Sequence, residues 1–200
     1  MKKNFFIIIF FIFLSTLLSN KASSYSSDPK QFITEVVNEA KKILVETNSQ
    51  AFKEEKLSEI ALKAADIDGI GYYTLGKYRK ELSKEDLNEY SKLFEKYFLK
   101  SFTSRLTDHS NPKIEVLEAE VLNSKYTIVK SLLLATDKKP EVKIDWRVYT
   151  KNPDKPLIRD LIVEGLSLAR TQKEEFAAIL ESNNGELSEL FAKLEEFINK

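Results

Sequence analysis

The stretch DLIVEGLSLARTQKEEF, residues 160–176, decides most about the fold. Residues 161–163 are Leu, Ile and Val in succession, so a strand formed here is apolar on both faces. Glu164-Gly165 then interrupts the run, which predicts a local break or bulge in the middle of a strand over 157–168. A strand with two apolar faces needs helices on both sides, or an apolar cavity on one of them.

Three further strands are predicted upstream, at 114–122, 126–136 and 141–149, because side chains of like polarity recur there with a period of two. The links between them are short, which favours antiparallel neighbours joined as a meander. The strand at 126–136 is also apolar on both sides. The strand at 141–149 separates into an apolar face of Val142, Ile144, Trp146 and Val148 and a second face of Lys143, Asp145, Arg147 and Tyr149.

Helices are predicted on either side of these strands. Apolar residues recur with helical spacing after a cap at Asp28, over 50–65 and, as an aromatic stripe, over 84–106. Residues 66–82 hold three of the five glycines and are expected to form short helical turns. Thr171-Gln172-Lys173-Glu174 is interpreted as a capping box that starts the next helix, and an amphipathic helix ends the chain. Along the chain, helices are followed by strands and then by helices again, an order that is typical of the α+β fold class.

The first residues have the composition of an export signal. Two lysines precede an apolar run over 5–18, and small residues follow up to Ser24. This pattern predicts a signal peptide over 1–24 with cleavage near Ser24. The run is too short to span a bilayer as a helix. Residues 25–200 are then expected to form a single exported domain without disulfides, because the chain has no cysteine.

Charge and composition exclude several classes of function. The whole chain has zero formal net charge, and the signal peptide removes three lysines and no acids, so the exported domain carries −3. No cluster of basic residues remains to track phosphates, so nucleic acid is not an expected partner. One histidine and no cysteine exclude a zinc site. Asp66 and Asp68 are interpreted as helix-cap or turn residues rather than metal ligands.

One segment resembles a catalytic motif. Gly165-Leu166-Ser167-Leu168-Ala169 lies between a predicted strand and a predicted helix, where a nucleophile elbow belongs. The final residue is alanine instead of glycine, and the only histidine, His109, precedes the serine instead of following it. We therefore interpret Ser167 as a strand-end residue whose hydroxyl bonds the backbone, and we predict no enzyme.

Two segments resemble the MlaC family of periplasmic phospholipid-binding, or toluene-tolerance, proteins. The first runs from Asp66-Ile67-Asp68 to Tyr73-Thr74-Leu75-Gly76-Lys77-Tyr78. The second is Asp160-Leu161-Ile162-Val163-Glu164-Gly165-Leu166-Ser167-Leu168, followed by Phe176. The resemblance spans roughly residues 30–198. The chain departs from the family at Arg79, where the family has tryptophan.

The resemblance implies a function as well as a fold. It implies an α+β fold, with about four antiparallel strands packed with N- and C-terminal helices around an apolar lipid pocket. It implies phospholipid as cargo, no cofactor and no catalysis. It also implies a periplasmic carrier, expected to be a monomer, that shuttles phospholipid between an outer-membrane lipoprotein complex and an inner-membrane ABC transporter complex. Such shuttling maintains the lipid asymmetry of the outer membrane.

The expected pocket walls are apolar and aromatic, from helices and strands alike. The predicted wall residues are Ile70, Tyr73, Leu75, Tyr78, Phe94, Tyr97, Phe98, Ile144, Trp146, Val148, Val163, Leu166 and Phe176. Two other readings stay open. One is a small-substrate enzyme on a cone-shaped α+β fold, with Asp145 or Glu164 as its buried acid or base. The other is an interaction module whose core is fully packed and leaves no cavity.

Overall fold

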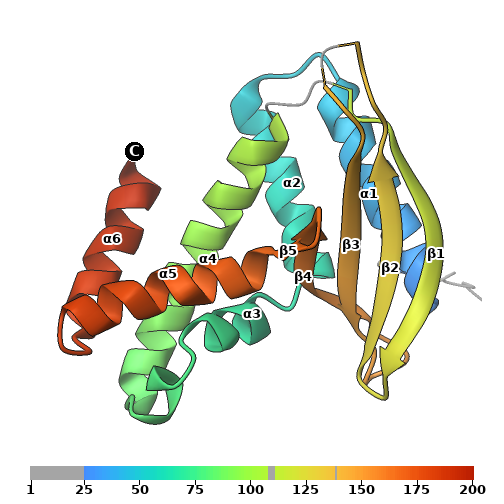
Figure 1. Cartoon of the computed structure of the whole chain (residues 1–200). Coiled ribbons are helices and arrows are strands. Elements are labelled where there is room, and N and C mark those ends of the chain that lie inside the picture. The colour runs from blue at the N-terminus through green and yellow to red at the C-terminus, as the bar shows by residue number, and fades with distance from the viewer. Residues whose placement is uncertain (1–24, 108–110, 138) are drawn as a thin grey trace, which may run out of the picture.

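The computed structural model describes residues 25–107, 111–137 and 139–200, and the predicted signal peptide lies outside them. The helices before the sheet are α1 (Pro29–Val45), α2 (Gln50–Ala64), α3 (Ile67–Thr74), the 3₁₀ turn η1 (Tyr78–Lys80) and α4 (Lys84–Thr107). The strands are β1 (Ile114–Asn123), β2 (Tyr126–Leu133), β3 (Val142–Tyr149), β4 (Leu157–Val163) and β5 (Leu166–Ser167). The chain ends with α5 (Leu168–Ser182) and α6 (Leu187–Asn199). The predicted α+β fold is confirmed, with five strands rather than four (Figure 1).

The sheet is an antiparallel meander in which each strand pairs with the next, in the order β1-β2-β3-β4-β5. Trp146 on β3 lies opposite Val129 on β2 and Leu161 on β4, so these three side chains share one face, which we call the inner face. Arg147 is one residue out of phase and shares the opposite, outer face with Ile128 and Asp160. The register therefore assigns the paired strand residues to one side of the sheet or the other, except at the register shifts in β1 and around Arg159 on β4.

The predicted strand over 157–168 is wrong in one respect, because the chain reverses at Glu164-Gly165. Both residues have positive φ angles, 48° and 82°. Val163 then pairs with Leu166, which makes β4 and β5 a hairpin with a two-residue turn. Positive φ at both central positions is the geometry of the tight turns that join twisted strands. The interruption is a hairpin turn rather than a bulge inside one strand.

The partner of Glu164 is the backbone of Lys143 on β3. The amide of Glu164 donates to the carbonyl of Lys143 at 3.0 Å, and the Glu164 carboxylate accepts from the Lys143 amide. The glutamate thus continues the β3–β4 ladder beyond the last strand pair and fixes the turn against its neighbour. It is an exposed residue with a structural role.

Helix α5 begins earlier than the sequence predicts. Its N-cap is Ser167, whose hydroxyl oxygen accepts from the Arg170 amide at 3.1 Å, and the helix starts at Leu168. Thr171 therefore lies inside the first turn, where its hydroxyl donates to the Ser167 carbonyl. The predicted capping box at Thr171 is wrong because a serine directly after the β4–β5 hairpin can cap the helix one turn sooner.

The apolar interior consists of two clusters. The first core joins α1 and α2 to the inner face of the sheet, where Val129 and Val148 are fully buried. The second core joins α3, α4, α5 and α6 around Tyr90 and Phe94. Figure 1 shows α1 against the sheet and α6 at the opposite end of the molecule. The helices at that end are attached to the sheet where the Asp66 amide, just after α2, donates to the Ile158 carbonyl on β4.

Among the described residues, no matching layer of apolar side chains covers the outer face of the sheet. Ile128 and Leu132 on β2 are only half-buried there, and Lys130 between them bridges Glu118 and Glu120 on β1 at 3.0 and 3.1 Å. Of the two arrangements that the apolar strands allowed, helices on both faces or a cavity on one, the second fits. The inner face supplies the walls of a cavity, described next.

Candidate functional site

An apolar cavity of about 390 Å³ lies between the inner face of the sheet and helices α1, α2, α4 and α5. Ile144, Trp146, Leu161 and Val163 form its sheet side, and they share that face because of the strand register. The helical side is apolar too. It includes Val36, Val37 and Leu44 from α1, Leu57 and Ile60 from α2, Ile70 from α3, and Phe94, Phe98, Phe102 and Leu106 from α4.

Small residues on the facing helices leave this space open. Ala40, Ala61, Ala64 and Ala169 all border the cavity, and each stands on a helix face where larger side chains would fill it. Alanine favours the helix and adds only one methyl group to the interior. The cavity therefore follows from the choice of side chains along α1, α2 and α5.

A few polar groups interrupt the apolar wall. Lys41, Arg105, Arg159, Asp160 and Glu175 bring charge to it, and Gln172 brings an amide. The Tyr97 hydroxyl donates to the Gln172 amide oxygen at 2.7 Å. Burial, and secondarily the Glu175 carboxylate, raises the pKa of Tyr97, which keeps its hydroxyl neutral. A mostly apolar cavity with a few polar groups matches a ligand that is largely hydrocarbon.

The structure brings seven of the predicted wall residues together around the cavity. They are Ile70, Phe94, Tyr97, Phe98, Ile144, Trp146 and Val163. The other six lie elsewhere. Leu75 and Phe176 are buried in the second core, against which Tyr78 packs, and Val148 is buried in the first core. Tyr73 and Leu166 are 43% and 58% exposed, Leu166 because it follows the β4–β5 turn.

The sequence did not predict the parts of the cavity wall that α1 and α2 form. Val36 and Ala40 on α1, and Ile60, Ala61 and Ala64 on α2, stand out there only as the apolar face of an ordinary amphipathic helix. The usable signal was the group of alanines on two neighbouring helices, since a face with small side chains cannot fill the space opposite it. The sequence-based prediction of the cavity walls relied on large aromatic residues instead of these alanines.

Asp160 ties the sheet to α5 beside the cavity, through its hydrogen bonds to Ser167 and Ala169. The residue is 4% exposed, and its carboxylate accepts from the Arg147 guanidinium at 3.0 Å, the Ser167 hydroxyl at 2.6 Å and the Ala169 amide at 3.0 Å. The expectation that Ser167 serves local structure is confirmed, because its hydroxyl donates to Asp160 and accepts from the Arg170 amide. Both hydrogen bonds of the Ser167 hydroxyl therefore serve to hold the first turn of α5 in place.

A second network joins α3 to the sheet. Asp66 caps α3 by accepting from the Gly69 amide, as predicted, and also accepts from the Arg159 guanidinium at 2.7 Å. Arg159 donates to the Tyr126 hydroxyl and lies 3.7 Å from the centre of the Tyr149 ring. Burial alone would lower the pKa of Arg159, but the hydrogen bonds to Tyr126 and Asp66 raise it.

Three other features were sought in the described part of the chain: a metal site, a membrane-spanning helix, and an acid or base inside the cavity. Within residues 25–107, 111–137 and 139–200 there is no group of three acidic or histidine side chains that could hold a metal ion. No helix in those ranges is long and apolar enough to cross a membrane. Asp145 is half-buried on the outer face of the sheet and Glu164 is exposed, so neither lies in the cavity.

A meander sheet whose inner face meets helices around an apolar cavity leaves room for a largely apolar ligand. The chain belongs to the MlaC family: the family model, described as MlaC protein, matches residues 19–196. Among solved structures, the chain resembles the phospholipid-binding protein from Ralstonia solanacearum in complex with a phospholipid. The TM-score is 0.69 at 18% identity, covering 84% of this chain and 94% of that one. No curated protein sequence matches the chain.

Proposed function

We propose that this protein is a periplasmic carrier that encloses the acyl chains of a phospholipid in the apolar cavity. The observation that carries the proposal is the cavity itself, about 390 Å³ and lined mainly by aliphatic and aromatic side chains. Its volume is in the range of ligand sites, about 300–1,000 Å³. Membership of the MlaC family supports the proposal, as does the shared fold with a protein that binds phospholipid.

Burial of methylene groups supplies the affinity in this account. Each methylene removed from water contributes about 0.8 kcal/mol, so an acyl chain is held without specific polar contacts. The lipid-contacting residues we propose are the seven predicted wall residues that border the cavity, with Val36, Ala40, Ile60, Ala61 and Leu161. The lipid is cargo, and the protein needs neither a cofactor nor catalysis to carry it.

The cellular role that we propose is supported by membership of the family. A signal peptide over residues 1–24, cut near Ser24, exports residues 25–200 as a single domain, which acts as a monomer. The carrier accepts phospholipid at one membrane complex and delivers it at the other. These complexes are an outer-membrane lipoprotein complex and an inner-membrane ABC transporter complex. This traffic maintains the lipid asymmetry of the outer membrane, and the partners open the cavity for transfer.

The proposal is tested by filling the cavity. Ala61 borders it, whereas the next residue on α2, Leu62, is 50% exposed. Ala61→Trp is expected to lower the amount of phospholipid that is extracted per mole of purified protein, because the indole occupies the space of the acyl chains. Overpacking costs about 1–3 kcal/mol of folding stability, so thermal unfolding is measured alongside. Mass spectrometry of the organic extract gives the lipid content.

Leu62→Trp is the matched control, since it places the same side chain one residue away on the solvent side of α2. It is expected to carry as much phospholipid as the unmodified protein. If Ala61→Trp stays folded and carries the same amount of lipid as the Leu62→Trp control, the acyl chains do not lie in this cavity.

A further inference from the structure

A second hollow, of about 450 Å³, is lined by three arginines. We call it the arginine hollow, and its lining residues are Gly69, Tyr73, Arg79, Leu122, Tyr126, Arg147 and Arg159. Arg147 belongs to the outer face of the sheet and lines the arginine hollow but not the apolar cavity. Arg159 borders both spaces. The hollow is thus separate from the proposed acyl site but adjoins it at β4.

The charge of the arginine hollow is only partly compensated. Arg147 is paired with Asp160, and Arg159 with Asp66. Arg79 has no carboxylate partner within the described ranges, and its guanidinium lies over the Tyr72 ring, 5.6 Å from the ring centre. No acidic residue is among those that line the hollow. Three guanidiniums with two paired carboxylates leave one net positive charge, which favours an anion.

The hydrogen-bonding groups of the hollow also favour an acceptor. The Nε–H of Arg147 is buried and donates to no acceptor among the residues that the structure describes. This N–H therefore reports on a ligand bound nearby, while the rest of the Arg147 side chain, which is 32% exposed, supplies the contact. The Tyr126 hydroxyl oxygen accepts from Arg159, which leaves its own hydrogen available for donation. These donors and those of Arg79 are the ones that an oxyanion requires.

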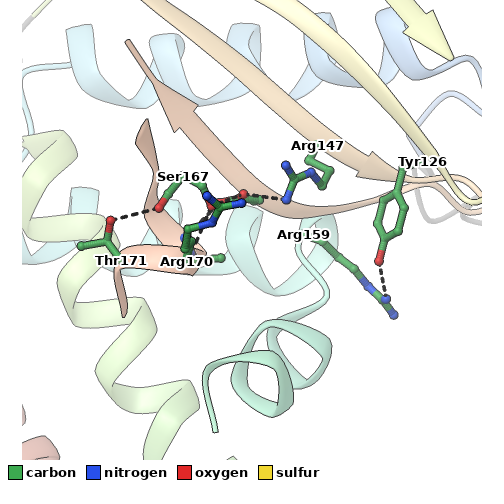
Figure 2. Close-up of polar contacts among 8 residues, drawn as sticks. Tyr126, Arg147, Arg159, Ser167, Arg170 and Thr171 are labelled. Atoms are coloured by element: carbon green, nitrogen blue, oxygen red, sulfur yellow. Dashed lines mark hydrogen bonds and ion pairs between the residues drawn. The ribbon is translucent and has the colours of Figure 1, made fainter. Parts of the chain in front are cut away.

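Two of the three arginines are held in place before any ligand arrives. Asp160 fixes Arg147, while Asp66, Tyr126 and the face of the Tyr149 ring fix Arg159. Figure 2 shows both guanidinium groups extending from neighbouring strands, with Tyr126 beside Arg159. Arginine groups fixed in this way lose little conformational freedom on binding, and their planar forks match the oxygens of a phosphate group.

We propose that the arginine hollow binds a phosphate oxyanion, held by Arg79 and by the preorganised Arg147 and Arg159. The phosphate belongs either to a small soluble phosphate ester or to the headgroup of a lipid, and both present the same oxygens to the site. The volume of the hollow exceeds that of the phosphate alone, so it also accommodates the alcohol that the phosphate esterifies. This site does not depend on what fills the apolar cavity.

Titration with sn-glycerol 3-phosphate and with inorganic phosphate tests the site. The readout is the set of arginine Nε–Hε resonances of the purified protein, together with calorimetry. Saturable binding with a shift of the Arg147 Nε–Hε signal is expected. Arg79→Ala should weaken binding about tenfold, the effect of losing one charge-assisted hydrogen bond of about 1.4 kcal/mol. Absence of saturable binding of both probes overturns the proposal.

Arg170 supplies the matched control, because it is an exposed arginine near Asp160 that does not line the hollow. Arg170→Ala should bind the probes as the unmodified protein does. If Arg79→Ala and Arg170→Ala give the same affinity as the unmodified protein, the hollow is not an oxyanion site. Phospholipid content is measured on the same samples, so a failure of this proposal is distinguished from a failure of the carrier function.

The source of the phosphate is decided by competition. Protein stripped of lipid and protein loaded with phospholipid from vesicles are titrated with sn-glycerol 3-phosphate. If loading blocks the probe, the lipid headgroup places its phosphate in the arginine hollow. If loading leaves the titration unchanged, the natural ligand is a soluble phosphate ester. Both outcomes support the oxyanion site and assign its ligand.

Discussion

At the scale of the single residue, Asp160 is the one acidic side chain in the described ranges that is buried. Its carboxylate accepts from a guanidinium on β3, a hydroxyl at the start of α5 and a backbone amide of α5. A carboxylate with three donors fixes the position of α5 relative to β4. Because Ala169 and Gln172 on α5 border the cavity, this position also sets the shape of the cavity wall.

Asp160→Asn is expected to lower the free energy of unfolding by about 1.5–3 kcal/mol. The substitution removes the charge opposite Arg147 and places an amide group, itself a donor, against other donors. The midpoint of urea unfolding measures the loss. Asp145→Asn, on the same face of the neighbouring strand, is the control and should change stability by less than about 0.5 kcal/mol. Equal unfolding midpoints for the two variants would contradict the role given to Asp160.

At the scale of the element, the β4–β5 hairpin is the feature that joins sheet and helix. The turn at Glu164-Gly165 reverses the chain, and the Ser167 cap starts α5 within three residues. The backbone of Gly165 has a φ of 82°, and a Cβ added there would meet nothing within 4 Å. The glycine is therefore required by backbone conformation alone, and not by close packing.

Gly165→Ala is expected to cost about 1 kcal/mol of folding stability, because an alanine in the left-handed region crowds its own backbone. Gly165→Asn should cost less, since asparagine tolerates positive φ better than alanine does. Thermal or urea unfolding of the two variants gives the comparison. Alanine as stable as glycine at this position, or asparagine worse than alanine, would show that the turn does not hold this conformation in solution.

The strands and most helices could be predicted because their patterns are periodic. The alternation of Ile144, Trp146 and Val148 separates an apolar from a polar face of β3, but only the structure shows that the apolar face is the inner one. The turn could not be distinguished from a bulge, because a glycine within an apolar run is typical of both. Glutamate is also not a residue that tight hairpin turns favour at the first central position. The cap was predicted at Thr171, and only the geometry of the turn shows that the Ser167 hydroxyl caps α5 instead.

At the scale of the whole molecule, function depends on space that the packing leaves open. The two cores hold the sheet and the helices at either side, and the apolar cavity lies between them. Sequence patterns identify residues that avoid water, but they do not distinguish a residue that packs, such as Phe176, from one that borders a cavity, such as Phe94. For this reason only part of the wall was predicted.

The central claim is that the cavity carries phospholipid. The most direct measurement is organic extraction of the protein purified from the periplasm, with mass spectrometry of the extract, followed by uptake from phospholipid vesicles after stripping. We expect phospholipid in the purified protein in a fixed ratio, and renewed loading of the stripped protein. Protein that contains no phospholipid and takes none up from vesicles would contradict the account.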